Sequence, residues 1–184
     1  MMRQSIWLTL VALCGCVPVA ASFYEPHGAG DIKSVSGGCS MAPRFQVTQH
    51  LPGHVDVEVS AIAITPGIAH ASIAISIRVP GGTAVRLTEP TITVREGPSA
   101  PAIRLKIDRI HKPRTIVNGQ VSDYLEPGDP LSGPAGYGIE VQLSHENPAD
   151  LIITLPPLDI DGQHVEVGPS EFVLKSRTHL TGFC

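Results

Sequence analysis

Residues 55–79, VDVEVSAIAITPGIAHASIAISIRV, decide the fold. From position 69 to position 79 the odd residues are aliphatic and most of the even residues are polar, a period of two that is typical of a strand with one buried face. Pro66-Gly67 interrupts the apolar run and predicts a turn. The stretch is therefore predicted to be a β-hairpin, in which one row is buried and the other is more exposed: Ile73, Ile75 and Ile77 against Ser72, Ser76 and Arg78.

The first strand of this hairpin changes character along its length. Valines alternate with polar residues from position 55 to position 60, whereas residues 61–64 are apolar at every position. A strand that is apolar on both faces needs cover on both faces. We therefore expect the second half of this strand to run through the middle of the fold.

Short segments of similar character, separated by Gly and Pro turns, follow along the chain, and none has the period of an amphipathic helix. In one of them Ile103, Leu105 and Ile107 alternate with charged residues and are expected to face inward. The pattern predicts an all-β fold, an antiparallel β-sandwich (immunoglobulin-like or similar) of roughly nine short strands, with a partly closed barrel as the alternative. The candidate strands outside the hairpin are residues 45–50, 83–88, 91–95, 103–107, 115–117, 139–143, 151–155, 165–167 and 172–175.

The first 21 residues resemble a secretory signal. Arg3 supplies a positive start, residues 6–13 are apolar, and small residues follow. The apolar part is shorter than the roughly 20 residues that a membrane-spanning helix needs, and no later segment is long and apolar enough for one. The protein is therefore predicted to be exported, to the periplasm or beyond it, with no transmembrane helix in the mature chain.

Two processing sites compete in this leader. Val19-Ala20-Ala21 fits cleavage after Ala21, which would make residues 1–21 the signal peptide. Leu13-Cys14-Gly15-Cys16 resembles a bacterial lipobox, which would make residues 1–15 the leader and Cys16 a lipid anchor. Both sites stay open from the sequence.

The remainder divides into an arm and one domain. Residues 22–44 contain glycines and polar residues without a sustained period, which predicts an irregular N-terminal arm. Residues 45–184 are predicted to be a single β-sandwich domain. Within it, residues 118–138 form the longest segment without a period, and a loop of this length is often functional.

The charge of the chain excludes one class of partner. Lys and Arg number 13 against 17 Asp and Glu, a net charge of −4, and loss of Arg3 with the leader would make it −5. A general nucleic-acid binder needs a basic stripe, so we expect no nucleic-acid partner. The one basic cluster, expected to be a solvated face with an anionic partner or lipid headgroup as the alternative, consists of Arg104, Lys106, Arg109, Lys112 and Arg114.

Two cysteines remain after the leader, Cys39 and the last residue, Cys184. An exported protein with one cysteine near each end of its mature chain favours a disulfide between them, because its compartment is oxidising. This pairing predicts that the first and last ordered segments are neighbours.

The histidines offer candidate metal ligands. His50 and His54 are the closest pair, but Pro52-Gly53 between them rules out the helical spacing that aims two imidazoles at one metal. His164 lies near Asp159 and Asp161, yet the Asp161-Gly162 pair predicts a turn before a strand more readily than a calcium loop. No cofactor, metal site or catalytic residue is predicted.

The leading functional hypothesis follows from export, the all-β pattern and the lack of a catalytic motif. It is a non-enzymatic binding, adhesion or structural protein of the bacterial cell envelope, whose partner is an unidentified protein or envelope component. One alternative is a periplasmic metal-binding protein that uses His50 and His54. A second alternative is a hydrolase with an unrecognised site.

Overall fold

The computed structural model of the chain describes residues 17–35, 43–65, 68–107, 110–112, 115–117, 135–143 and 146–181. These residues form fifteen strands in three sheets, and every strand pair is antiparallel. No α-helix occurs among them, and the one helical element is a 3-10 turn, Pro52–His54. The all-β prediction is confirmed, with more strands than the roughly nine expected.

The largest sheet has seven strands and is built around the predicted hairpin. Strand β4 (Val55–Ile62) pairs with β5 (Ser72–Val79), and an isolated bridge from Thr65 to Ile68 continues the pairing toward the turn. The order across the sheet is β10-β9-β11-β5-β4-β3-β2. The other five strands are β2 (Asp31–Val35), β3 (Arg44–Leu51), β9 (Ile110–Lys112), β10 (Thr115–Val117) and β11 (Ala135–Gln142).

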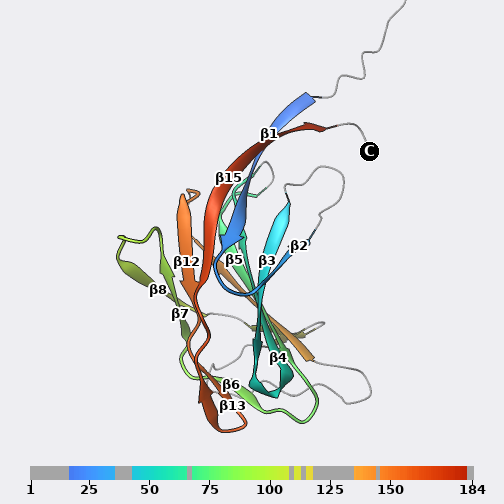
Figure 1. The fold of residues 1–184 in the computed structure, drawn as a ribbon, viewed down its shortest axis with the longest axis vertical. Helices are drawn as coiled ribbons and strands as arrows, with labels where there is room; N and C mark the ends of the chain where they lie inside the picture. The colour runs from blue at the N-terminus through green and yellow to red at the C-terminus, as the bar shows by residue number, and fades with distance from the viewer. Residues whose placement is uncertain are drawn as a thin grey trace, which may run out of the picture.

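The second sheet has five strands in the order β1-β15-β12-β7-β8. Its first pair joins the two ends of the described chain, because Val17 lies opposite Thr181 and His27 opposite Glu171. Figure 1 shows this pair as a long ribbon that projects beyond the other strands. The members are β1 (Val17–His27), β7 (Thr91–Arg95), β8 (Ala102–Lys106), β12 (Asp150–Thr154) and β15 (Ser170–Thr181).

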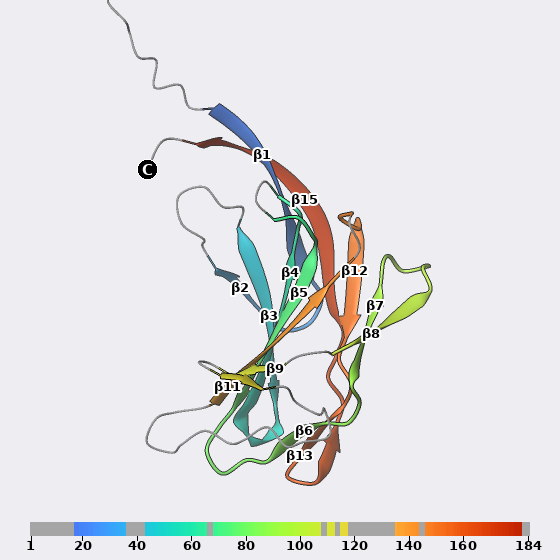
Figure 2. The ribbon, with the colours of Figure 1, turned by 180° about the vertical axis from the view of Figure 1, so that it is seen from behind.

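A third sheet of three short strands lies at the end of the molecule opposite the tip of the ribbon, as both Figure 1 and Figure 2 show. Its hairpin turns at Asp161-Gly162, where both residues have positive φ, 52° and 81°. This confirms the predicted Asp-Gly turn, whose backbone twist suits a two-residue hairpin. The strands are β6 (Val85–Leu87), β13 (Leu158–Ile160) and β14 (Gln163–Val165).

One continuous apolar core joins the three sheets. The predicted odd row of the hairpin lies in it, since Ile73, Ile75 and Ile77 are at most 2% exposed. Residues of the other two sheets complete the core, including Ile92, Val94, Leu151, Ile153 and Phe172 from the five-stranded sheet and Val85, Leu87, Leu158 and Ile160 from the three-stranded sheet. Burial of so many aliphatic side chains is the main source of stability of such a fold.

Two predictions about exposure are wrong. Ser72 is buried at 6% exposure rather than exposed, because this small side chain lies on β5 between the larger cross-strand residues Ile62 and Gln142. Ile103 is 45% exposed rather than buried, because β8 is the edge strand of its sheet. Figure 2 shows β7 and β8 projecting to one side of the molecule.

The predicted irregular arm, residues 22–44, is wrong for most of its described part. Residues 22–27 belong to β1 and residues 31–35 form β2, an edge strand of the other sheet. Strand β1 pairs with β15, which lies at the other end of the chain, and β2 pairs with β3, which follows it after a loop. Local composition does not reveal such pairing. The predicted loop also ends earlier than expected, because residues 135–138 belong to β11; its residues 118–134 lie outside the described ranges.

Strand β1 also contains two prolines, Pro18 and Pro26, which argue against a strand in the sequence. The amide of Leu174 in β15 donates to Ala149 on the β12 side, so even-numbered residues of β15 direct their backbone groups away from β1. The residues of β1 that lie opposite them, which include Pro18 and Pro26, then direct their own backbone to the open edge. Proline, which has no N–H, is tolerated there without loss of a ladder hydrogen bond.

Candidate binding face

The outward-facing side chains of the seven-stranded sheet form a polar surface, which we call the polar face. Cross-strand register builds it in rows, one of which runs from His50 through Asp56 to Arg78 and another from Thr48 through Glu58 to Ser76. These side chains alternate with those of the core, as the period of two requires. The polar face is carried by β2, β3, β4, β5 and β11 and includes Asp31, Gln46, His50, Asp56, Ser60, Ser76, Arg78 and Glu140, with Thr48 and Glu58 on the same side of the sheet but buried.

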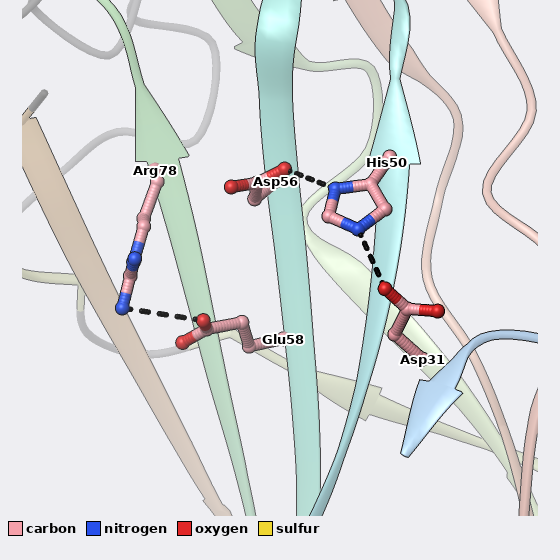
Figure 3. A network of polar contacts seen from close by, with 5 residues as sticks. All are labelled: Asp31, His50, Asp56, Glu58 and Arg78. Carbon is pink, nitrogen blue, oxygen red and sulfur yellow. Dashed lines mark hydrogen bonds and ion pairs between the residues drawn. The ribbon is translucent and has the colours of Figure 1, made fainter. Parts of the chain in front are cut away.

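His50 is held between two carboxylates at one end of this face (Figure 3). Its Nδ1 lies 2.6 Å from Oδ1 of Asp56, the residue opposite it on β4, and its Nε2 lies 3.1 Å from Oδ2 of Asp31 on β2. The imidazole therefore bridges three neighbouring strands. With both ring nitrogens placed against carboxylates, His50 can satisfy both contacts fully only when both nitrogens carry protons.

The two carboxylates raise the pKa of His50 above its usual value. The hydrogen bond that His50 donates to Asp56 is the largest cause, followed by the one that it donates to Asp31 and by the negative charge of Asp56. Opposite charges close to a titrating group favour its charged form. His50 is therefore protonated over a wider pH range than a free histidine.

A second charged pair lies deeper on the same face (Figure 3). Nη2 of Arg78 is 3.3 Å from Oε1 of Glu58, whose side chain is 11% exposed, while that of Arg78 is 51% exposed. A carboxylate that is nearly buried costs free energy unless a cation or hydrogen bonds compensate it. The Arg78 guanidinium supplies this compensation.

A hollow of about 490 Å³ opens beside His50. Its wall is made by the turn between β1 and β2, by three successive residues of β3, and by the segment that leads into β15. Gly30, in that turn, has φ +128° and lies so close to β3 that an added Cβ would be 2.7 Å from Cγ1 of Val47. The lining residues are Gly28, Ala29, Gly30, Asp31, Thr48, Gln49, His50, Gly168, Pro169 and Glu171.

Hydrogen bonds hold the walls of this hollow together. Nε2 of Gln49 donates to the carbonyl of Gly168 at 2.8 Å and to Oγ of Ser170 at 3.3 Å, which connects β3 with the start of β15. Thr48, another lining residue, is 2% exposed, and its hydroxyl is buried with no hydrogen-bond partner among the described residues. A buried hydroxyl without a hydrogen bond costs free energy, so Thr48 is the least well satisfied polar group in this wall.

A second hollow, of about 330 Å³, lies over the middle of the polar face. Small residues on neighbouring strands leave the space, and Glu58 and Glu140 are among those that border it. The lining residues are Gln46, Glu58, Ser60, Ala74, Ile75, Ser76, Gly138, Ile139 and Glu140.

His50 and His54, the closest histidine pair of the sequence, are not grouped with a further possible metal ligand in the part of the chain that the structure describes. His54 is exposed in the 3-10 turn, and both nitrogens of His50 already face carboxylates. Among the described residues, no group of three or more His, Cys, Asp or Glu is placed to hold a metal ion. His164 is exposed and lies 3.5 Å from Glu166, while Asp159 pairs with Arg86 at 2.7 Å.

Several other predicted residues fall outside the described ranges. These include Cys16, Cys39 and Cys184, so the lipid anchor and the disulfide stay predictions. In the basic cluster, Arg104 pairs with Glu89, Lys106 is exposed, and nothing is described of the side chains of the other three members. The described part of the chain contains no helix long and apolar enough to cross a bilayer.

Asp31 and Asp56 were not singled out from the sequence. The signal for Asp56 was present, because a tight turn at positions 52–54 places position 56 opposite His50 in a hairpin. No comparable signal exists for Asp31, since the sequence predicts an irregular arm where β2 lies. No family model, curated protein sequence or solved structure matches this chain.

Proposed function

We propose that the chain is an exported, non-enzymatic β-sandwich protein of the bacterial cell envelope that binds a positively charged partner in the hollow beside His50. Export is supported by the leader-like first 21 residues. The sandwich is supported by the single core to which both large sheets contribute apolar rows.

The observation that carries the binding proposal is the charge of this hollow. Asp31 and Glu171 line it, and Asp56, which is not a lining residue, contacts Nδ1 of His50. None of the described residues that line it is Lys or Arg, so His50 is the one lining side chain that can carry a positive charge. Three carboxylates against one imidazolium leave a negative potential, which attracts a cation such as a lysine side chain.

The position of His50 also favours binding over hydrolysis. A histidine that activates a nucleophile needs one ring nitrogen facing the hydroxyl or thiol that it deprotonates. Both nitrogens of His50 face carboxylates instead. The imidazole is placed to fix the two aspartates on the surface, and the aspartates keep oxygens free for a ligand.

A titration with small charged peptides tests the proposal. The mature protein is titrated with a blocked trilysine peptide at low ionic strength, followed by calorimetry or fluorescence of a labelled peptide. We expect weak, salt-sensitive binding that Asp31→Asn and Glu171→Gln each weaken by about two- to fivefold, the usual effect of one exposed charge.

The matched control is Glu146→Gln, which removes the same charge from an exposed position outside the hollow. A triglutamate peptide serves as the control ligand. Binding that is unchanged in Asp31→Asn and Glu171→Gln, or that is lost equally in Glu146→Gln, would refute the hollow as the site.

A further inference from the structure

Strand β1 runs without interruption through one of the two predicted processing sites. It extends over Val17–His27, and each of its residues has a partner on β15 in one continuous register. The two sites differ in what they do to this strand. Cleavage after Ala21 falls inside it, whereas cleavage before Cys16 falls ahead of its first residue.

Cleavage after Ala21 would remove residues 17–21 from the fold. Five of the eleven partners along the β1–β15 ladder would be lost, from Val17 opposite Thr181 to Ala21 opposite Arg177. Ala21 itself is 8% exposed, so the loss would also uncover a buried contact. The far half of β15 would then have no partner on either side among the described strands, because its pairing with β12 extends only from Ser170 to Val173.

An unpaired strand of this length is unfavourable. Its backbone N–H and C=O groups form a template for pairing with other chains, which folded proteins normally cover or block. Pro18, one of the two prolines whose backbone faces the open edge of β1, would also be removed. Residues 17–21 therefore have the properties of a folded strand rather than of a discarded leader.

We infer that the exported chain is cut before Cys16, so that the mature protein keeps all of β1 and carries a lipid on its first residue. The inference rests on the proposed export and is independent of ligand binding in the hollow. It selects the lipobox-like Leu13-Cys14-Gly15-Cys16 over Val19-Ala20-Ala21. Two separate observations support it: this sequence motif behind an apolar segment, and the continuous pairing of residues 17–21 with β15.

The chemistry balances with an anionic phospholipid as the donor. The Cys16 sulfur displaces the phosphoglycerol headgroup from the diacylglyceryl carbon, so a C–S bond forms, a C–O bond breaks, and the thiol proton leaves with the released glycerol phosphate. Water then hydrolyses the Gly15–Cys16 peptide bond, and Cys16 becomes the N-terminus. A diacylglyceryl group gives stronger membrane binding than a single acyl chain, which holds only marginally.

This arrangement makes the ribbon of β1 and β15 the link between the lipid and the rest of the protein (Figure 1). Val17 follows Cys16 directly in sequence, and residues 17–24 of an extended strand span roughly 25 Å. Lys175 and Arg177 are exposed on the ribbon, and basic residues close to anionic headgroups are attracted to them.

The direct test is the mass of the processed protein. The full-length chain is expressed in a bacterial host, extracted with detergent, and measured intact by mass spectrometry. We expect a species that begins at Cys16 with a diacylglyceryl group, and its loss in Cys16→Ser. A species that begins at Ser22 would overturn the inference, and so would an unprocessed chain without lipid, which would also count against export.

A second measurement needs no lipid. Two leaderless chains, one starting at Val17 and one at Ser22, are compared in thermal unfolding. We expect the chain from Ser22 to unfold at a temperature about 5–10 °C lower, because it lacks nearly half of the pairs between β1 and β15. Equal unfolding temperatures would overturn the claim that residues 17–21 belong to the fold.

Discussion

Truncation of Ile75 to alanine tests the hairpin on which the fold is built. Ile75 lies on β5 between Val59 on β4 and Ile139 on β11, and it is 2% exposed. The substitution removes three carbon atoms. Their transfer accounts for about 2.4 kcal/mol at roughly 0.8 kcal/mol per buried methylene.

The cavity that remains adds to this loss. The position lies in the middle of a paired sheet, where the backbone can relax little, so a further loss of about 1–2 kcal/mol is expected from the unfilled volume. We therefore expect Ile75→Ala to lower the free energy of unfolding by about 3.5–4.5 kcal/mol.

Chemical denaturation with urea, followed by circular dichroism, measures this difference. The matched control is Ser76→Ala, the adjacent residue on the opposite face, for which we expect a change below about 1 kcal/mol. If Ser76→Ala were as damaging as Ile75→Ala, the assignment of the two faces of β5 would be refuted, because a shift of one residue exchanges them.

Three further predictions follow from the charged groups and the cysteines. Arg78→Ala should lower the free energy of unfolding by about 1–3 kcal/mol in urea denaturation, because Glu58 is left nearly buried without its cation, and adding Glu58→Gln should recover part of the loss. The raised pKa of His50 stabilises the fold below the unfolded-state value of about 6.5, and this contribution should disappear as pH rises through the folded-state pKa. Unfolding measured across pH should therefore show this loss in the native chain and not in His50→Gln. Cys39→Ser and Cys184→Ser should destabilise the exported protein equally, with the double variant no worse than either, and thiol labelling of the denatured, unreduced protein should find neither cysteine free.

Three results would contradict these expectations. Full stability of Arg78→Ala would mean that the carboxylate is compensated by another group. Identical pH dependence in the native chain and His50→Gln would show that the carboxylate contacts do not shift the titration of this residue. Two free thiols per mature chain would exclude the disulfide.

The fold was predictable where one face of a strand is buried and the other is exposed to solvent. The hairpin of β4 and β5 has this pattern, and the structure confirms its alternation at Ile73, Ile75 and Ile77. The turn at Asp161 was predictable for another reason, because few residue pairs adopt positive φ twice in succession.

Strand β1 was not predictable from local pattern. Its burial does not alternate cleanly, since both Ala21 and Tyr24 are buried, and it contains two prolines. Its partner β15 lies at the other end of the chain, and no short-range signal encodes such pairing. The position of Asp31 beside His50 was not predictable either, because it depends on the pairing of β2 with β3.

Burial at the margins of the sheets was also hard to predict. The alternation of β8 correctly places Ile103 on the same side as Val94, its cross-strand neighbour. Alternation shows which residues share a face but not whether another layer covers that face. Ile103 is therefore exposed while Val94 is buried.

The most direct test of the proposed binding site is a map of backbone amide shifts. ¹⁵N-labelled mature protein is titrated with the blocked trilysine peptide, and amide signals are followed by nuclear magnetic resonance. We expect shifts confined to the lining of the hollow, at residues 28–31, 48–50, 168 and 171, and no shifts with triglutamate. Shifts centred on β7 and β8, or spread evenly over all acidic segments, would contradict it.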